Sequence, residues 1–309
     1  MIQVADTAND REKPMAADSL LALSQRLNQA VETLAALGAE LRVRQEGLTI
    51  DPRVRQGLLD IVAGLAPGSL PTRGPNEEAV TLAFIQAFFR QALDLLENPG
   101  RAPGWTYTDP VVLQAMGQAS RRVVHAISEL ALRRPLLALA LARPGVLLDI
   151  GTGVGWFAIE AARTWSALSV LGIDNWEPAL ALAHKNVTDA GLHERVRLRT
   201  QALQDFRDRD AFSLAWIPGP FVPKSIVEDA LERVRDALIL DGWLVFGLYA
   251  PVPDRLGEAL TNLRIVRSGG YPWSASEVEA RLRDLGFDQV ETFAPGPPVL
   301  FVIGHKPAA

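Results

Sequence analysis

The chain has 309 residues, of which 48% are hydrophobic and 22% charged, as in an ordinary folded protein with one large or two modest domains. Its net charge of -5 argues against a protein that binds nucleic acid through a basic face. The absence of cysteine excludes disulfides, thiolate metal sites and cysteine nucleophiles.

Neither a membrane segment nor a metal site is expected. No uninterrupted apolar run reaches the roughly 20 residues of a membrane-spanning helix, and residues 1–17 lack the apolar core of a signal peptide. We therefore expect a cytoplasmic protein with a flexible tail over residues 1–17. The four histidines, at positions 125, 184, 193 and 305, lack the i, i+4 spacing of a helical metal site, so no metal is expected.

The first ordered element is predicted to be a long helix. Ser19 can cap it, and leucine and valine recur at helical spacing over residues 20–41. Such an apolar stripe must be buried against something. Two alternatives remain open, packing on its own domain and dimerisation with a second copy.

Further helices are predicted up to about residue 143. They cover residues 52–66, 76–97, 110–133 and 135–143. Pro144-Gly145 is the predicted boundary, because strands and helices alternate after it. We therefore predict a helical lid or dimerisation domain over residues 18–143 and an α/β domain over residues 144–309.

One segment of the helical part carries aromatic residues in a loop. Trp105 and Tyr107 lie just before the helix that begins after Asp109. The segment is either an aromatic hinge between domains or a substrate lid, since aromatic rings present rigid faces to a planar ligand. Gln118, on the helix that follows, is a further candidate for the substrate pocket.

The α/β part opens with a strand that runs into a glycine loop. Residues 146–150 are almost continuously apolar, as in a parallel strand covered on both faces, and Gly151, Gly153 and Gly155 follow. A second apolar run ends at Asp174, where a carboxylate can accept hydrogen bonds from ribose hydroxyls. These features indicate an adenosine-type cofactor, used either by nicotinamide dehydrogenases or by methyltransferases.

The end of the chain distinguishes these two classes. Strands are predicted over residues 287–293 and 299–303, and their link is too short for a crossover helix. The last two strands must therefore pair antiparallel. The glycine spacing, G-x-G-x-G, also differs from the G-x-G-x-x-G of dinucleotide-binding proteins.

The stretch Leu148-Asp149-Ile150-Gly151-Thr152-Gly153-Val154-Gly155 resembles the first motif of class I S-adenosylmethionine-dependent methyltransferases. The resemblance extends from residue 146 to the C-terminus and leaves the first half unmatched. It implies an α/β fold with a seven-stranded Rossmann-like sheet, whose last strand is antiparallel, and S-adenosylmethionine as the cofactor.

The resemblance also implies roles for individual residues. Gly151, Thr152, Gly153 and Gly155 would line the amino-acid part and ribose of the cofactor, with Asp149 near its ammonium group and Asp174 on the ribose hydroxyls. Asn175 and Trp176 would flank the adenine. Gln201, followed by Ala202 and Leu203, takes the place of an acidic residue that often binds the adenine amine, and its carbonyl can still accept.

The edge after the fourth strand would face the methyl group. It reads Trp216-Ile217-Pro218-Gly219-Pro220-Phe221 and lacks the polar first residue of methyltransferases that act on nucleic-acid bases. Trp216 and Phe221 are therefore expected to wall an apolar substrate pocket, and Trp216 is also expected to contact the cofactor, with ordinary packing as its alternative. No catalytic constellation is evident, and His125 and Tyr107 are weak candidates for the catalytic group.

The sequence thus predicts a methyltransferase that acts on a small, partly apolar or aromatic molecule at oxygen, nitrogen or carbon, mainly through proximity and orientation. It predicts no nucleic-acid partner, and the apolar stripe of the N-terminal helices is compatible with a homodimer. The alternatives are a nicotinamide-dependent oxidoreductase, a protein methyltransferase and a non-catalytic binding module on the same fold.

Overall fold

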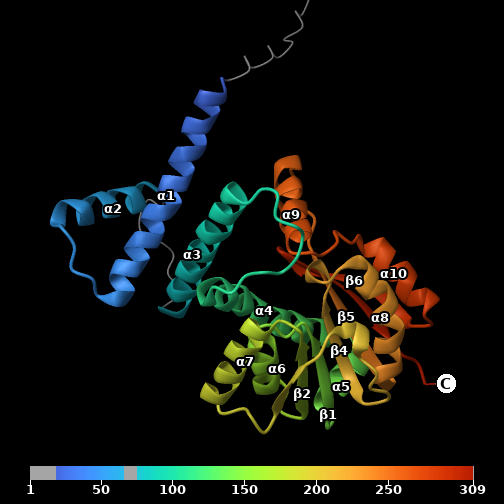
Figure 1. Cartoon of the computed structure of the whole chain (residues 1–309). Coiled ribbons are helices and arrows are strands. Elements are labelled where there is room, and N and C mark those ends of the chain that lie inside the picture. Colours follow the sequence, from blue (N-terminus) through green and yellow to red (C-terminus); the bar gives the residue numbers. More distant parts are fainter. Residues whose placement is uncertain (1–18, 66–74, 309) are drawn as a thin grey trace, which may run out of the picture. The chain divides into compact units, whose positions relative to one another are not determined.

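The structure is a computed structural model, and it describes residues 19–65 and 75–308 (Figure 1). The tail predicted over residues 1–17 lies outside the described residues. The contacts within the chain divide it into two compact units, Met1–Ile85 and Gln86–Ala309.

The first unit is helical, as predicted. It contains α1 (Leu20–Glu46), α2 (Pro52–Leu65) and the first part of α3 (Pro75–Glu97). The N-cap prediction is confirmed, because the Ser19 hydroxyl accepts a 3.2 Å hydrogen bond from the amide of Ala22. A Cβ at Gly38 would lie 2.9 Å from Cγ2 of Ile85, so this glycine permits α1 and α3 to approach closely.

The second unit is built on one seven-stranded sheet. Its strands are β1 (Gly145–Ile150), β2 (Leu168–Asp174), β3 (Val196–Thr200), β4 (Phe212–Pro218), β5 (Leu238–Tyr249), β6 (Asp288–Gly296) and β7 (Val299–His305). Their order is β3-β2-β1-β4-β5-β7-β6. The first five strands of this order are parallel, and β7 pairs antiparallel with both β5 and β6. The predicted fold class and the antiparallel last strand are confirmed.

Helices cover both faces of this sheet (Figure 1). After α3, the helices of this unit are α4 (Pro110–Ala131), α5 (Pro135–Ala142), α6 (Trp156–Thr164), α7 (Glu177–Asp189), α8 (Lys224–Ala237), α9 (Arg255–Arg267) and α10 (Ala275–Asp284), with two 3₁₀ turns, η1 (Leu203–Asp205) and η2 (Gly219–Phe221), and α9 belongs to neither core layer of the sheet. One core layer joins α4, α5 and α6 to the sheet, and a second joins α8 and α10 to its other face. The central strands β1, β4 and β5 are therefore buried on both faces, which explains their continuous apolar runs, whereas the edge strands β3 and β6 are largely exposed.

The units divide the chain at a different place from the predicted boundary at residue 144. That boundary follows the change from helices to alternating strands, whereas the compact unit begins at Gln86. The reason is packing, because Val124 and Ile127 of α4 and Leu137 of α5 belong to the core of the sheet domain. These two helices are thus part of the α/β unit.

Two stretches differ from the sequence prediction. Pro223 and the apolar spacing after it predict a helix to about residue 240, but α8 ends at Ala237, and β5 already begins at Leu238, which pairs with Phe212. The strand then changes direction at Asp241, whose φ is 61°. In addition, α9 was not predicted; its Leu256, Leu260 and Leu263 are exposed, and only Ile265 of this helix is buried.

Among the described residues, one helix is long and apolar enough to cross a membrane, namely the part of α3 from Glu77 to Glu97. A core helix of a globular protein passes the same test, but such a helix is mostly buried, whereas 17% of the apolar stretch of α3 is buried. Within the second unit its charged groups pair with other segments, since Arg90 contacts Asp109 at 2.5 Å and Asp94 contacts Arg267 at 2.8 Å. These ion pairs favour a helix packed on protein.

Candidate functional site

The glycine loop joins β1 to α6 through three residues with left-handed backbone angles. The φ values are 65° at Gly151, 55° at Gly153 and 81° at Gly155, a region that favours glycine. A Cβ at Gly153 would meet nothing closer than the Gly151 carbonyl oxygen, at 3.9 Å. The loop backbone is therefore open to a close ligand at this point.

Asp149 lies beneath this loop as a buried carboxyl group. It is 1% exposed, and the Thr152 hydroxyl donates a 2.6 Å hydrogen bond to it. Burial raises the pKa of Asp149 to about 7; the Thr152 hydrogen bond opposes this rise, and the charge of Asp174 adds to it. The carboxyl group can thus change its charge close to neutral pH, and a cationic ligand would favour its ionised form.

Asp174, at the end of β2, ties two loops together. One carboxylate oxygen accepts from the amide of Gly153 and the other from the amide of Trp176, both at 2.8 Å. Burial raises the pKa of Asp174, against hydrogen bonds from the backbone of Trp176, Gly153 and Asn175. Because each carboxylate oxygen has a second lone pair, the group can still accept from hydroxyls.

These groups meet where the strand order reverses. β1 lies between β2 and β4, and the chain continues outward in opposite directions from this pair. In open α/β sheets, ligands bind at the carboxyl ends of the strands at such a switch point. The glycine loop, Asp149 and Asp174 all lie at these carboxyl ends.

Gln201 lies at the same edge, but its amide is engaged by neighbours. Its backbone amide donates to the Asp174 carbonyl at 2.8 Å, and its side-chain oxygen accepts from Arg199 at 3.0 Å. Its side-chain nitrogen donates to the Asp205 carbonyl at 3.2 Å. Ala202 is partly exposed beside it, whereas Leu203 is buried in the core, so its side chain is not available to a ligand.

The aromatic segment lies against the loop that follows Asp174. The indole nitrogen of Trp176 donates a 2.8 Å hydrogen bond to the carbonyl of Tyr107. Trp105, Tyr107 and Trp176 pack on Leu113 and Val154 in one apolar cluster. Asn175 is exposed next to this cluster. The structure therefore brings the predicted lid residues and the predicted adenine-side residues together.

A chain of edge-to-face ring contacts continues across the carboxyl ends of β4 and β5. Trp105 contacts Tyr107 at a centroid distance of 5.4 Å and Phe221 at 5.9 Å. Phe221 in turn contacts Tyr249, the last residue of β5, at 6.4 Å. Tyr249 was missed by the sequence analysis, because only the pairing of β5 with β4 brings it to this edge.

Trp216 is placed away from this edge. Its side chain is 6% exposed, stacked on Phe157 at 5.4 Å and edge-on to Phe301 at 5.8 Å. A Cβ at Gly247 would lie 2.2 Å from its ring, so the neighbouring strand leaves room for it. Trp216 therefore matches the packing alternative, because its side chain points into the layer between the sheet and α6.

The remaining candidates on α4 face α6. His125 is 65% exposed, and its Nε2 lies 3.3 Å from a carboxylate oxygen of Glu160. Arg121 donates to Glu160 at 2.9 Å and to the side-chain oxygen of Gln118 at 3.3 Å. The structure thus brings Gln118 and His125 into one ion-pair network with Glu160, rather than into the aromatic cluster.

Gln114 and Asn186 form a further polar link that the sequence did not reveal. The Gln114 side-chain oxygen accepts from Trp156 at 2.6 Å and from Asn186 at 3.1 Å. Asn186 also donates to the carbonyl of Val154 at 2.8 Å. The pair therefore connects α4 and α7 to the glycine loop. Single polar residues on helices give no sequence signal of such a role.

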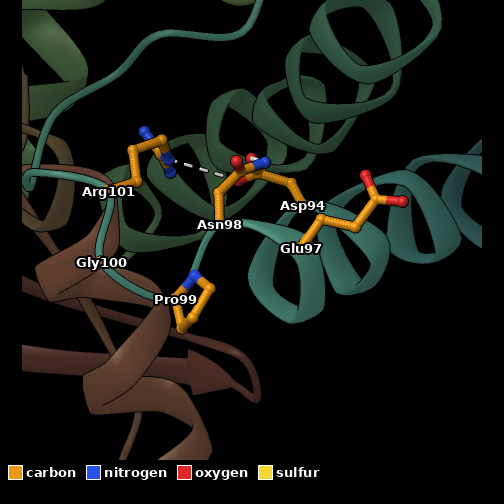
Figure 2. A pocket seen from close by; sticks show the side chains of 6 residues that line it. All are labelled: Asp94, Glu97, Asn98, Pro99, Gly100 and Arg101. Carbon is orange, nitrogen blue, oxygen red and sulfur yellow. Dashed lines mark hydrogen bonds and ion pairs between the residues drawn. The ribbon is translucent and has the colours of Figure 1, made fainter.

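A surface hollow lies at the end of α3, apart from the glycine loop (Figure 2). It is lined by Asp94, Glu97, Asn98, Pro99, Gly100 and Arg101. Its acidic and basic groups pair with one another, since Asp94 lies 3.3 Å from Arg101. The chemistry of the sheet edge therefore makes the glycine loop, and not this hollow, the candidate site. No group of three or more potential metal ligands occurs among the described residues.

Comparisons with known proteins agree with this geometry. Residues 147–242 match a family described as a methyltransferase domain. A probable cobalt-precorrin-6B C(15)-methyltransferase (decarboxylating) of Pyrobaculum calidifontis is 26% identical over 159 residues, which are 50% of this chain and 80% of the relative.

Solved structures show the same fold at low identity. An O-methyltransferase family protein from Burkholderia thailandensis is 15% identical with a TM-score of 0.67, over 95% of this chain and 100% of that one. Human N-acetylserotonin methyltransferase, solved with S-adenosylmethionine, is 15% identical with a TM-score of 0.61, over 96% and 100%. These two structures show the fold alone, whereas the family match over residues 147–242 favours methyl transfer over the nicotinamide-dependent alternative.

Proposed function

We propose that this enzyme uses S-adenosylmethionine to methylate a small, partly apolar or aromatic molecule, in keeping with the match of residues 147–242 to a methyltransferase domain. The acceptor atom is oxygen, nitrogen or carbon. The observation that carries this proposal is the aromatic surface of Trp105, Phe221 and Tyr249 beside the switch point of the sheet. A planar acceptor can stack there next to the cofactor.

The residues at the switch point fit the cofactor. The open backbone at Gly153 permits a close approach of its amino-acid part, with Gly151, Thr152 and Gly155 shaping the same loop. Asp149, a buried carboxyl group that accepts a hydrogen bond from the Thr152 hydroxyl, suits the ammonium group, directly or through water. Asp174 retains lone pairs for the ribose hydroxyls. Asn175, Trp176 and the Gln201–Ala202 stretch flank the adenine in this proposal.

S-adenosylmethionine supplies an activated methyl group on a sulfonium, so the protein mainly has to orient the acceptor and exclude water. Good orientation alone lowers a barrier by roughly 7–11 kcal/mol. Burial raises the pKa of Tyr249, an effect that the charge of Arg264 opposes, and the phenol stays protonated at neutral pH. In the described part of the chain, the Tyr249 hydroxyl has no hydrogen-bond partner, so it is available to orient a polar group of the acceptor.

The helical region predicted over residues 18–143 has two roles in this proposal: its aromatic segment, in the second unit, acts as the lid, and α1 and α2, in the first unit, act in dimerisation. Its first two helices present exposed apolar side chains, among them Leu23, Leu27, Val31, Val54 and Ile61. A homodimer through these helices would bury them. Sedimentation velocity tests this proposal, and a monomer at micromolar concentration contradicts it. The cytoplasmic location stays a prediction from the sequence.

The first experiment is a calorimetric titration with S-adenosylhomocysteine, with NAD in parallel, on the wild type and on Asp174→Ala. The proposal expects micromolar affinity for S-adenosylhomocysteine, no binding of NAD and a large loss of affinity in the variant. Absence of S-adenosylhomocysteine binding would remove the enzyme assignment. A melting experiment is the independent check, because a ligand at a hundred times its Kd stabilises a protein by about 2.7 kcal/mol.

The acceptor class is tested with a labelled methyl donor. Phenols, aromatic amines, indoles and aromatic carboxylic acids form the first panel, and an unfolded protein and single-stranded DNA serve as macromolecular comparisons. Labelling of small aromatic molecules supports the proposal. Cofactor binding with labelling of the unfolded protein only would favour a protein methyltransferase, and binding with no turnover on any acceptor class would favour a non-catalytic module.

A further inference from the structure

Tyr107 forms hydrogen bonds with two residues that lie far apart in the sequence, Asp94 and Trp176. Its hydroxyl donates a 3.2 Å hydrogen bond to Asp94, near the end of α3. Its carbonyl accepts a 2.8 Å hydrogen bond from the indole of Trp176, which follows β2. Burial raises the pKa of the Tyr107 phenol, and the charge of Asp94 raises it further, so the hydroxyl remains a donor. The hydroxyl is thus already committed to Asp94 rather than free for an acceptor.

Asp94 is the centre of a compact ion-pair network. Its carboxylate accepts from Arg267 at 2.8 Å and from Asn98 at 3.2 Å, and it lies 3.3 Å from Arg101. Figure 2 shows Arg101 and Asn98 turned toward it. Burial raises the pKa of Asp94, but the hydrogen bond from Arg267 and the charge of Arg101 outweigh that effect and lower it below its usual value. Asp94 therefore stays ionised and holds its partners.

The network fixes the segment that carries Trp105. The amide of Gly104 donates to the carbonyl of Arg267 at 3.1 Å. A Cβ at Gly269 would lie 2.9 Å from the Cα of Gly104, so the two backbones are in close contact. Residues 98–109 are therefore anchored to α3 and to the end of α9, with Trp105 beside Phe221.

The other contact of Tyr107 leads to the cofactor side. Trp176 donates its backbone amide to Asp174 and its indole N–H to Tyr107. A ligand that binds the Asp174 carboxylate restrains Trp176, and Trp176 restrains the carbonyl of Tyr107. The two ends of this path are thus the ribose side of the cofactor site and the aromatic acceptor surface.

We propose that Tyr107 is a positioning residue that couples occupancy of the cofactor site to the placement of Trp105 against the methyl acceptor. The proposal rests on the methyltransferase function given above. Coupling of this kind is reciprocal, so a bound acceptor tightens the cofactor by the same factor as the cofactor tightens the acceptor.

The test is hydrogen exchange of residues 101–109 with and without S-adenosylhomocysteine. In the wild type, the ligand slows exchange there by at least about fivefold, the lower end of typical coupling. Trp176→Phe removes the indole donor and keeps an aromatic ring. In this variant the ligand still protects residues 151–155, whereas its effect on residues 101–109 falls below about twofold.

Two further variants distinguish a loss of the coupling from a nonspecific increase in the mobility of the protein. Trp165→Phe is the matched control, because its indole also donates one hydrogen bond, to Ser128 at 3.1 Å, away from the aromatic segment. In the Trp165→Phe variant, S-adenosylhomocysteine should slow hydrogen exchange of residues 101–109 as much as in the wild type. Tyr107→Phe breaks the bond to Asp94, speeds exchange of the segment without ligand and, once an acceptor is known, raises the KM for it more than it lowers kcat.

Equal ligand protection of residues 101–109 in Trp176→Phe and the wild type would overturn the coupling, and so would an equal loss in Trp165→Phe. A wild type in which S-adenosylhomocysteine leaves residues 151–155 unprotected is a different result. It would mean that the cofactor site itself is absent, and the proposed function would fail together with the coupling.

Discussion

The hydroxyl of Thr152 donates a 2.6 Å hydrogen bond to the buried carboxyl group of Asp149. This contact depends on the neighbouring strand, because a Cβ at Gly172 would lie 2.6 Å from the same hydroxyl oxygen. The glycine loop thus rests on Asp149 and Thr152, and Gly172 of the neighbouring strand leaves room for the Thr152 hydroxyl. The arrangement makes the protein sensitive to pH near neutrality.

Asp149 should destabilise the folded protein as the pH rises. Its pKa is raised from 3.8 to about 7, so the folded state keeps a proton that the unfolded state has lost in this window. At about 1.36 kcal/mol per unit, the free energy of unfolding falls by up to about 4 kcal/mol between about pH 4 and pH 8. Asp149→Asn should flatten this dependence in melting curves, whereas Asp284→Asn, at an exposed position, should leave it unchanged. A wild-type slope in Asp149→Asn would contradict the assignment.

Gly153→Ala should separate ligand binding from backbone strain. Gly153 and Gly191 have similar φ values, 55° and 68°, and a Cβ at Gly191 would meet nothing within 4 Å. Alanine at either position should lower the free energy of unfolding by about 1–2 kcal/mol, the cost of a left-handed conformation. Only Gly153→Ala should weaken S-adenosylhomocysteine binding in calorimetry, by about tenfold or more, the equivalent of 1.4 kcal/mol. Similar affinities of the two variants would exclude a close approach of the ligand at Gly153.

Trp216→Phe tests whether this tryptophan packs or binds. Its ring is sandwiched between Phe157 and Phe301, so a smaller ring should leave a void and cost about 1–3 kcal/mol of stability. The affinity for S-adenosylhomocysteine should stay within about twofold, less than 0.5 kcal/mol. Loss of affinity at unchanged stability would instead establish a contact between Trp216 and the cofactor.

His125→Ala should leave turnover almost intact. The imidazole is 65% exposed and pairs with Glu160, and no aromatic residue of the proposed acceptor surface contacts it. Removal of a general base lowers kcat by about 10²–10⁴-fold. A change within about twofold in steady-state assays would therefore exclude that role, whereas a hundredfold loss would establish it.

Gln114→Leu should be costly for stability. It leaves the indole nitrogen of Trp156 and the amide of Asn186 without their shared acceptor. An unsatisfied buried polar group costs about 1–3 kcal/mol. Gln118→Leu, one helical turn away, loses only a 3.3 Å contact from Arg121 and should cost less than about 0.5 kcal/mol in denaturant titrations. An equal loss of unfolding free energy in the two variants would mean that the hydrogen bonds of Gln114 contribute no more to stability than the contact of Gln118.

Much of the sheet could be predicted because its signals are local. The glycines after β1, the carboxylate after β2 and the short link before β7 each lie within a few residues of the element that they define. The pairing of Asp94 with Arg267 spans 173 positions and joins a predicted helix to one that the periodicity did not reveal. Likewise, nothing in the sequence around Tyr249 indicates its role, because only the pairing of β4 with β5 brings it to Phe221.

At Trp216, by contrast, a local sequence signal was present but predicted the wrong surroundings for the side chain. Its position after a buried strand run suggested a pocket wall, but the side chains of a strand alternate between the two faces of the sheet. Leu214 and Trp216 share the face that packs on α6, whereas Ala215 and Ile217 share the other. An aromatic residue near the carboxyl end of a strand therefore reaches the site only if the pleat directs it beyond the edge.

The position of β7 has a consequence for synthesis of the protein. This strand is made after β5 and β6, yet it lies between them in the sheet. Until it emerges from the ribosome, β5 presents an unpaired edge from Trp243 to Tyr249, and β6 has no partner. An open apolar edge is a site for chaperones and for aggregation. We therefore expect a nascent chain stalled before residue 299 to be far more sensitive to protease than one released after residue 305.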